Sequence, residues 1–467
     1  MQPKIIVLDD DPTGSQTVHS CLLLTQWDSD TLRYALQDES PLFFVLTNTR
    51  SVSPDRAAEI TREVCRNLSE PLADYGRPWL VVSRSDSTLR GHYPVETDVL
   101  AEELGPFDAH FMTPAFFEGG RITKEGTHYV VRDGVATPAH ETEFAKDSVF
   151  GYSTAYMPDY VEEKTAGRIR ARDVIHFPTT LSDGEMLDLL RGLSGNVCCT
   201  VDTETQDQMD RFARLVLQVA GEGKRFLFRS AASLLTSLAD LPPQPIAAEE
   251  MARYVPDNRP GLVVVGSHVP MSTRQLENII SRRPVEALEL DVEALPDSSG
   301  EVEASLSRRL AGAHEAGRDA VLYTSRAERT FATPEERLAF GEEISRIMMG
   351  VIQGAPATLG FLISKGGITS NDVLSTGLGL KTARVVGQIH PGCSVVVTPE
   401  THRFGSIPVV IFPGNVGNDE SITLVYDRFK GNQRRIRRLA PRRSLPLYWR
   451  LSRYDNEDTE CSSIHRP

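Results

Sequence analysis

Three consecutive carboxylates follow an apolar run near the N-terminus. Residues 5–8 are apolar, and Asp9, Asp10 and Asp11 come directly after them, ahead of Pro12-Thr13-Gly14. A short run of branched side chains that ends in acids predicts a strand whose carboxyl end carries negative charge. Ligands bind at that edge of the sheet in open α/β folds. A purely structural turn rarely needs three adjacent negative charges, so we interpret this segment as part of a ligand site.

Two further polar clusters in the N-terminal half follow apolar runs in the same way, one after residues 42–46 and one after 80–82. Their candidate binding side chains are Asn48, Arg50, Arg84, Asp86 and Arg90. If the strands are parallel, all three clusters share one sheet edge. They then suit a small polyhydroxylated acid, because Arg pairs bidentately with a carboxylate while Asp and Asn accept hydrogen bonds from hydroxyls. Asp86 or Arg50 alone would indicate a helix cap or a surface ion pair, but three clusters in register favour a binding cleft.

The C-terminal half carries three glycine-containing loops after apolar runs, at residues 265–272, 364–372 and 412–419. Glycines let the backbone approach an anion closely, and exposed amides at a following helix start favour phosphate. Residues 377–382 have the wrong spacing for a G-x-x-x-x-G-K-[ST] loop, and no G-x-G-x-x-G follows a strand. The loops therefore predict phosphate contacts without a standard nucleotide motif. Lys365, beside the glycine pair, either contacts phosphate or faces solvent.

Short apolar runs alternate with longer amphipathic stretches along the chain. The runs are residues 5–8, 42–46, 80–82, 226–228, 262–265, 321–323, 361–363, 395–397 and 409–412. Ser53-Pro54 and Thr333-Pro334 with Glu336 mark helix starts, and a further helix is predicted around residues 233–238. These repeated βα units predict an α/β fold of two domains, each a mostly parallel sheet flanked by helices.

Proline density and charge indicate where the domains divide. Five prolines lie in residues 242–260, a density that interrupts regular structure. We therefore expect one domain over residues 1–241, a linker over 242–260, and a second domain over 261–428. Residues 429–467 carry clustered arginines without apolar periodicity, which predicts a basic tail that is disordered or loosely docked.

Composition limits the class of protein. The chain has 467 residues, of which 40% are hydrophobic and 24% charged, as in an ordinary globular protein. The net charge of -14 argues against a general nucleic-acid surface, which needs clustered Lys and Arg. None of the six cysteines forms a C-x-x-C pair or has zinc-ligand spacing with His, so no structural metal is expected. Without a signal segment or an apolar run of about 18 residues, we expect a cytoplasmic protein with no membrane partner.

Several motifs together resemble the four-carbon acid sugar kinase family, in the same order and over about residues 4–428. The motifs are Asp10-Asp11-Pro12-Thr13-Gly14, Asn48-Thr49-Arg50, Asp86-Ser87-Thr88-Leu89-Arg90-Gly91, Pro114-Ala115-Phe116 with Gly120-Arg121, Gly266-Ser267 with Arg274-Gln275, and Gly366-Gly367-Ile368-Thr369-Ser370. The resemblance implies an acid-sugar-binding N-terminal domain and a nucleotide-binding C-terminal domain. It further implies that ATP phosphorylates a hydroxyl of a four-carbon sugar acid, such as a threonate, an erythronate or a 3-oxo-tetronate, and that the protein forms a homodimer.

The resemblance also implies roles for the residues at matching positions. Sugar-acid contacts would come from Asp10, Asp11, Arg50, Asp86 and Arg90, and Asn48 and Arg84 in the same clusters are further candidates. Asp11 or Asp10 would accept the proton of the attacking hydroxyl, with direct Mg²⁺ binding by the Asp triplet as the alternative. Contacts to ATP, which binds with Mg²⁺, would come from Ser267, Gly366, Gly367, Thr369 and Gly414.

Three segments of the nucleotide half depart from the family pattern. Many members have Ser-Gly-Ser-Cys-Ser at residues 265–269, Glu at Ile368, and a Lys-rich Gly-Phe-Gly loop near residues 413–418. These departures support an alternative function, in which the protein is a catalytically silent regulator that binds a sugar acid or a nucleotide. A lyase acting on the same substrates is a third hypothesis, disfavoured because the sequence has no metal-binding His cluster or obvious Schiff-base Lys.

Overall fold

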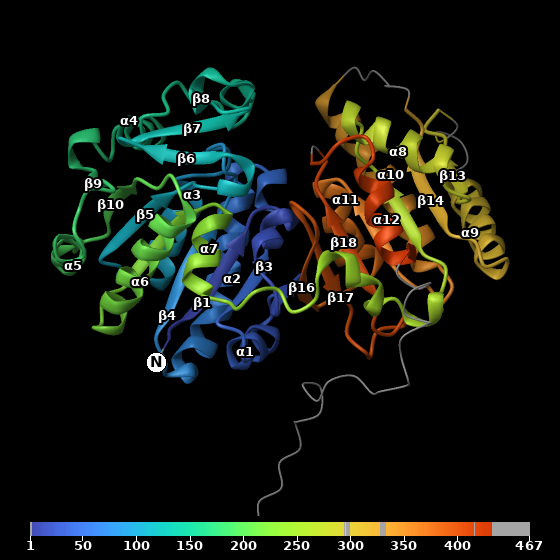
Figure 1. Cartoon of the computed structure of the whole chain (residues 1–467), viewed down its shortest axis with the longest axis horizontal. Helices are drawn as coiled ribbons and strands as arrows, with labels where there is room; N and C mark the ends of the chain where they lie inside the picture. The colour runs from blue at the N-terminus through green and yellow to red at the C-terminus, as the bar shows by residue number, and fades with distance from the viewer. Residues whose placement is uncertain (1, 294, 296–298, 327–332, 415, 432–467) are drawn as a thin grey trace, which may run out of the picture.

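The computed structural model describes residues 2–293, 295, 299–326, 333–414 and 416–431, and its fold is α/β as predicted. Two halves lie side by side, each with strands between helices (Figure 1). The predicted tail starts too early, because residues 429–431 form the last turn of α12 (Ser421–Gly431). Phe429 is buried there, with its ring 5.1 Å from that of Phe361. The rest of the predicted tail, residues 432–467, lies outside the described residues.

Within the N-terminal half, the strands of the main sheet pair with one another in parallel. In order across the sheet they are β2 (Cys21–Leu24), β3 (Leu42–Leu46), β1 (Lys4–Asp9), β4 (Trp79–Arg84), β11 (Phe226–Ser230), β5 (Ala109–Thr113), β10 (Val197–Val201) and β9 (Ile175–Phe177). Asp9 pairs in register with Leu46 of β3 and with Arg84 of β4. The three polar clusters therefore follow adjacent parallel strands and share one sheet edge, as the sequence predicts.

Helices cover both faces of this sheet, and the side chains of β1 alternate between the two cores. Ile5 and Val7 pack in the core that includes α5 (Asp183–Gly192), α6 (Gln206–Gly221) and α7 (Ala232–Ala239). Ile6 and Leu8 pack in the core that includes α1 (Ser29–Gln37), α2 (Pro54–Tyr75) and α3 (Val95–Leu104). The period-two alternation of a strand thus buries both of its faces. The helix α2 begins where predicted, with Ser53 as its N-cap.

A small antiparallel sheet lies over the carboxyl edge of the N-terminal strands (Figure 1). Its strands are β6 (Arg121–Lys124), β7 (Thr127–Arg132) and β8 (Val135–Pro138), and α4 (Met157–Lys164) follows them in the chain. The sequence pattern does not predict this sheet, because its strands are short and partly exposed.

The C-terminal half has its own group of parallel strands. They are β13 (Glu286–Leu290), β14 (Ala320–Thr324), β12 (Leu262–Val265), β15 (Leu362–Lys365) and β18 (Pro408–Phe412), and the antiparallel strands β17 (Cys393–Val397) and β16 (Thr382–His390) continue the sheet. The helices of this half are α8 (Pro270–Arg282), α9 (Ser299–Glu315), α10 (Pro334–Gln353), α11 (Gly367–Asp372) and α12. The helix α10 begins after Thr333, the predicted N-cap.

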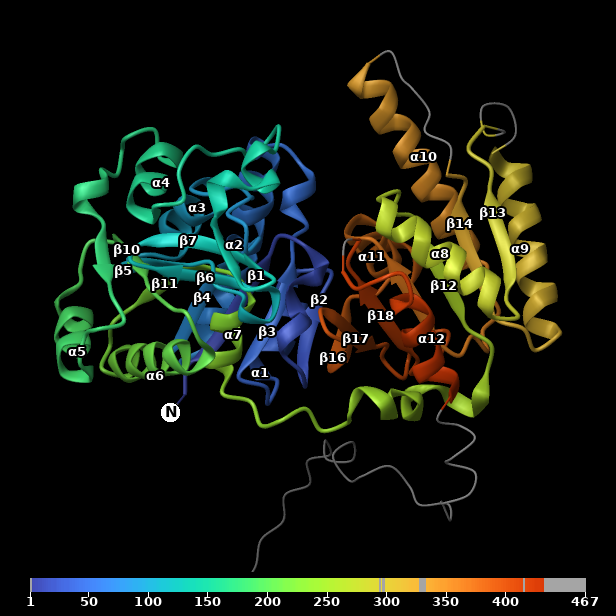
Figure 2. The same ribbon diagram turned by 45° about the horizontal axis from the view of Figure 1, so that its top comes forward.

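The two groups of strands join into one sheet of 15 strands, where two separate sheets were expected. The joining strands, β2 and β16, pair antiparallel and lie side by side in Figure 2, with Leu24 opposite Thr382. Beside them Arg384 and Asp38 form a two-pronged ion pair, with N–O distances of 3.0 and 2.5 Å. The predicted linker runs beneath this joint and contains two 3₁₀ helices, Ala248–Tyr254 and Pro256–Asn258. Among the described residues, every helix is too short or too polar to cross a membrane.

Candidate functional site

Asp9 and Asp10 are buried at the end of β1 and are held by neighbouring strands and loops. Asp9 pairs with Nη1 of Arg84 at 3.1 Å, and both side chains are almost fully buried. Burial raises the pKa of Asp9 to about 7. Asp10 accepts hydrogen bonds from Nη2 of Arg50 at 2.8 Å and from Oγ of Ser85 at 2.5 Å. Both carboxylates therefore organise the site from inside the protein.

Asp11 is the accessible carboxylate of the triplet, with 23% of its side chain exposed. Its Oδ1 accepts hydrogen bonds from the backbone nitrogen of Thr13 at 2.8 Å and from the Thr13 hydroxyl at 2.5 Å. Its Oδ2 is 3.4 Å from Nη2 of Arg50. Burial opposes the charge of Asp11, but Arg50, Arg84 and Thr13 outweigh burial and lower its pKa. Of the two catalytic candidates, Asp11 alone combines a stabilised negative charge with exposure.

Asp86 and Arg90 form a second charged pair at this edge of the N-terminal half. Nε of Arg90 donates to Oδ2 of Asp86 at 2.6 Å, and the Thr88 hydroxyl donates to the same oxygen. Burial alone would raise the pKa of Asp86, but Arg50 and Arg90 prevail and lower it to about 2. Asp86 and Arg90 line a small pocket that reaches Arg229.

The remaining predicted sugar contacts lie at the same edge. Arg50 bridges Asp10 and Asp11, and those carboxylates outweigh burial and raise its pKa. Asn48 adopts the left-handed conformation, with φ of 52°, and its amide donates to the Ser51 hydroxyl. Arg84 forms its ion pair with Asp9 inside the core. We therefore propose that Arg84 positions the Asp triplet and does not contact the substrate.

Sequence reasoning missed a buried network that supports these residues. Arg229 of β11 pairs with Glu96 at 2.5 Å, and Glu96 accepts a hydrogen bond from Thr49, the neighbour of Arg50. Gly91 lies against Arg229, with φ of 126°, and a Cβ there would be 2.4 Å from Nη2 of Arg229. The glycine at the end of the Asp86–Gly91 motif was the available signal. His92, which follows Gly91, donates to the backbone oxygens of Thr49 and Val52.

The predicted nucleotide contacts come together in the C-terminal half. A Cβ on Gly266 would be 2.4 Å from the Thr369 hydroxyl, and one on Gly366 would be 3.0 Å from the same atom. A Cβ on Gly414 would be 3.1 Å from the Ser267 hydroxyl. The three loops therefore pack closely on one another, and glycine at these positions avoids crowding of the Thr369 and Ser267 hydroxyls. Sequence reasoning missed Arg326, whose Nη1 donates to the Ser267 carbonyl oxygen at 2.6 Å and holds this loop in place.

Lys365 is fully buried, so the predicted solvent-facing alternative is wrong. Its Nζ donates to the Pro413 carbonyl oxygen at 2.6 Å and lies 4.1 Å from the centre of the Phe412 ring. Burial lowers the pKa of Lys365 to about 7. The side chain thereby ties the Gly366 turn to the Pro413-Gly414 turn.

The two halves meet where Asp11 faces the Gly366-Gly367 turn. A Cβ placed on Gly367 would be 3.2 Å from Oδ2 of Asp11. The accessible carboxylate of the N-terminal half and the glycine turn of the C-terminal half therefore lie next to each other.

Comparisons with known proteins match the N-terminal and C-terminal halves to two different family models. Residues 5–238 match the family model described as a sugar-binding N-terminal domain, and residues 262–422 match the model described as a nucleotide-binding C-terminal domain. A solved structure, Haemophilus influenzae protein HI1011, is similar in fold. It is 17% identical, has a TM-score of 0.61, and the match covers 91% of this chain and 100% of that one.

Two curated relatives are similar over nearly the whole length. A D-erythronate kinase of Heliobacterium modesticaldum is 25% identical over 455 residues, covering 91% of this chain and 96% of the relative. A D-threonate kinase of Salmonella typhimurium is 26% identical over 436 residues, covering 90% of this chain and 96% of the relative. With both family models matched in order, the chain belongs to the four-carbon acid sugar kinase family.

Proposed function

We propose that this protein is an ATP-dependent kinase that phosphorylates a hydroxyl of a four-carbon sugar acid. The observation that carries the proposal is the approach of Asp11 in the sugar half to Gly367 in the nucleotide half. A regulator that only binds one ligand does not need a charged, accessible carboxylate beside its nucleotide loops. The family membership and the two kinase relatives support the same activity.

Asp11 is the proposed acceptor of the proton from the attacking hydroxyl. Its lowered pKa keeps it ionised at neutral pH, and its hydrogen bonds to Thr13 fix its direction. Asp10 cannot take this role as readily, because Arg50 and Ser85 occupy its oxygens. Asp86, which is also ionised, is placed to accept hydrogen bonds from other hydroxyls of the acid. The protein therefore contributes position and charge, which dominate phosphoryl transfer.

The nucleotide half offers backbone more than side chains to ATP. Gly266, Gly366 and Gly414 let the three loops pack against the hydroxyls of Thr369 and Ser267, and we expect main-chain amides of these loops to hold the phosphates. The helix α8 begins directly after the 265–269 segment, and its N-terminus favours negative charge. Mg²⁺ bound with ATP would neutralise phosphate charge during transfer.

Purified protein incubated with ATP, Mg²⁺ and a panel of four-carbon acids that includes D-erythronate and D-threonate tests the proposal. ADP release that depends on one acid is expected. Saturable binding without turnover would favour the silent regulator, and carbon–carbon cleavage without ATP would favour the lyase.

The Asp11→Asn variant tests the proposed base. We expect kcat to fall about 10²- to 10⁴-fold with binding of the acid retained, because the amide cannot accept the proton. Asp30→Asn is the matched control, since the Asp30 side chain is 96% exposed, and it should keep wild-type kcat. An Asp11→Asn protein with undiminished kcat would remove the base role.

A further inference from the structure

Most arginines around Asp10 and Asp86 already have a carboxylate partner. Arg50 pairs with Asp10 and Asp11, Arg84 with Asp9, Arg90 with Asp86, and Arg229 with Glu96. Each of these cations is neutralised by the protein itself. Binding a further anion to one of them would require sharing or breaking an existing pair.

Arg121, at the start of β6, differs from this group. Within the part of the chain that the structure describes, no carboxylate oxygen lies within the 4.0 Å ion-pair distance of its guanidinium. Its Nη1 donates to the Gly119 carbonyl oxygen, and its Nε is buried without a hydrogen-bond partner. Burial lowers the pKa of Arg121, while the charge of Asp86 nearby opposes that effect. A partly buried cation without a counter-ion favours an anion supplied from outside.

The backbone and ring contacts of Arg121 hold its side chain in place before any ligand binds. Its backbone exchanges two hydrogen bonds with Phe116, of 2.9 and 3.0 Å. Gly120, with φ of 72°, precedes it, and a Cβ there would be 2.4 Å from the Val131 carbonyl oxygen. The Arg121 guanidinium lies over the Phe144 ring, 5.8 Å from the ring centre. The Arg90 guanidinium lies 5.2 Å from the same ring centre. Such preorganisation lowers the entropy cost of binding a small anion.

We propose that Arg121 binds the carboxylate of the sugar acid and so selects acids over neutral polyols. This inference rests on the proposed kinase function. It assigns the substrate carboxylate to Arg121 in place of Arg50, Arg84 and Arg90. Those three then organise Asp9, Asp10, Asp11 and Asp86. A planar guanidinium matches a carboxylate with two parallel hydrogen bonds, which an ammonium cannot reproduce.

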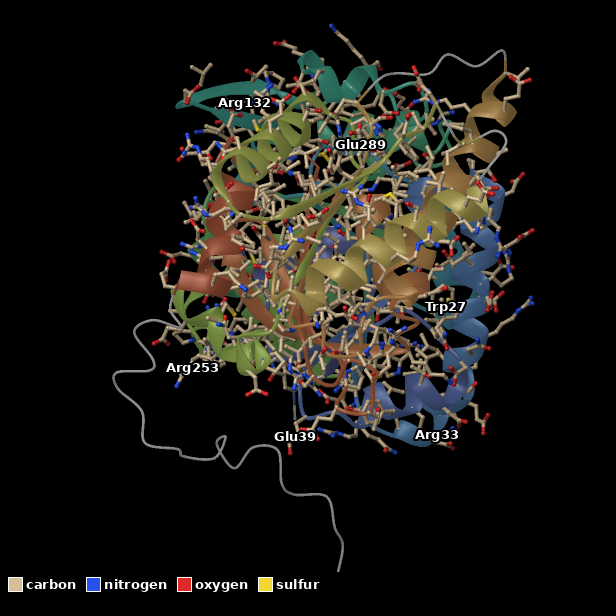
Figure 3. All side chains as sticks on the ribbon, turned by 90° about the vertical axis from the view of Figure 1, so that its right-hand side faces the viewer. Trp27, Arg33, Glu39, Arg132, Arg253 and Glu289 are labelled. Carbon is tan, nitrogen blue, oxygen red and sulfur yellow. The ribbon has the colours of Figure 1, made fainter. Side chains whose placement is uncertain are left out.

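The variants Arg121→Gln and Arg121→Lys test the assignment, with Arg132→Gln as the matched control. Arg132 lies over the same Phe144 ring at 5.4 Å, but its side chain is 56% exposed and paired with Glu143. Figure 3 shows it at the outer edge of the small sheet. Loss of ring packing alone would therefore affect both positions, whereas loss of carboxylate binding affects only Arg121.

Two readouts separate binding from catalysis. Calorimetric titration with D-erythronate and with D-threonate, without ATP, measures the Kd for the acid, and steady-state kinetics give KM for acid and ATP separately. For Arg121→Gln we expect Kd and KM for the acid to rise about 30- to 1,000-fold with KM for ATP unchanged, because a buried charge pair is lost. Arg121→Lys should recover part of the affinity, and Arg132→Gln should match wild type.

Each outcome bears on one of the two proposals. An Arg121→Gln protein that binds the acid within threefold of wild type would overturn the carboxylate assignment while leaving the kinase function intact. Wild type that binds the acid through Arg121 but releases no ADP would overturn the kinase function and leave the assignment standing. Wild type that binds neither acid would overturn both.

Discussion

Oδ2 of Asp11 lies 3.2 Å from the place where a side chain on Gly367 would begin. Asp11 has little freedom to retreat, because Thr13 and Arg50 hold both of its oxygens. The distance between the two halves at this point is therefore fixed by a glycine.

Gly367→Ala should damage activity more than folding. The added methyl group would push Asp11 and the glycine turn apart by a few tenths of an ångström, and we expect kcat/KM to fall about 10- to 100-fold. Gly312→Ala is the control, since nothing lies within 4 Å of a Cβ there and α9 should gain up to about 1 kcal/mol. Equal kinetics for the two variants would show that the halves do not need this close approach.

Gly91→Ala should destabilise the sugar half. A Cβ at Gly91 would be 2.3 Å from the Ser85 hydroxyl and 2.4 Å from Nη2 of Arg229, and φ of 126° is unfavourable for alanine. We expect a loss of about 2–4 kcal/mol in the free energy of unfolding, measured by urea denaturation. Gly184→Ala, which has open space around its Cβ, should change stability by less than about 1 kcal/mol.

Burial of Lys365 should make stability depend on alkaline pH. The folded protein releases the proton of Lys365 near pH 7, whereas the unfolded chain holds that proton up to the ordinary lysine pKa of 10.5. The unfolded state binds more protons in this window, so this residue makes stability rise with pH between about 7 and 10.

The variant Lys365→Met removes that dependence. The free energy of unfolding of Lys365→Met minus that of wild type should be largest at pH 7. It should fall by up to about 1.4 kcal/mol per pH unit between pH 7 and pH 10. Denaturant titrations at pH 7, 8.5 and 10 check this. Lys381→Met, at a side chain 66% exposed, should show a flat difference, and a flat difference for Lys365→Met would contradict the prediction.

The ion pair of Arg384 with Asp38 should stabilise the joint between the halves. Its side chains are 25% and 11% exposed, and the two bonds are parallel. A double-mutant cycle with Arg384→Gln and Asp38→Asn should give a coupling energy of about 1–2 kcal/mol. The exposed Arg56–Glu59 pair should give less than about 0.5 kcal/mol in the same experiment, and similar values for both pairs would contradict this role.

The sequence predicts the parts of the fold whose signals are local. Residues 5–8 and 42–46 lie in β1 and β3, because each is an apolar run bounded by polar turns. It does not predict that β2 pairs with β16, since these strands are more than 350 residues apart and nothing in their periodicity names a partner.

In the candidate site, too, the sequence predicts local features but not contacts between distant segments. Motif positions place Asp11, Arg50 and Asp86 at one edge, and the structure brings them together. Which arginine already has a carboxylate depends on distances across several strands, so the sequence alone predicts Arg84 as a ligand and assigns Arg121 no role. Likewise, residue type alone does not reveal that Lys365 lies in the interior.

Main-chain hydrogen bonds run without a break from the strands beneath Asp11 to those beneath Gly367, through β2 and β16. A hinge motion at the proline-rich connection alone cannot separate Asp11 from Gly367, because the strand ladder between the halves would have to shear or twist as well. The separation of Asp11 and Gly367 is then set by backbone pairing between the halves, which side-chain replacement alone leaves unchanged.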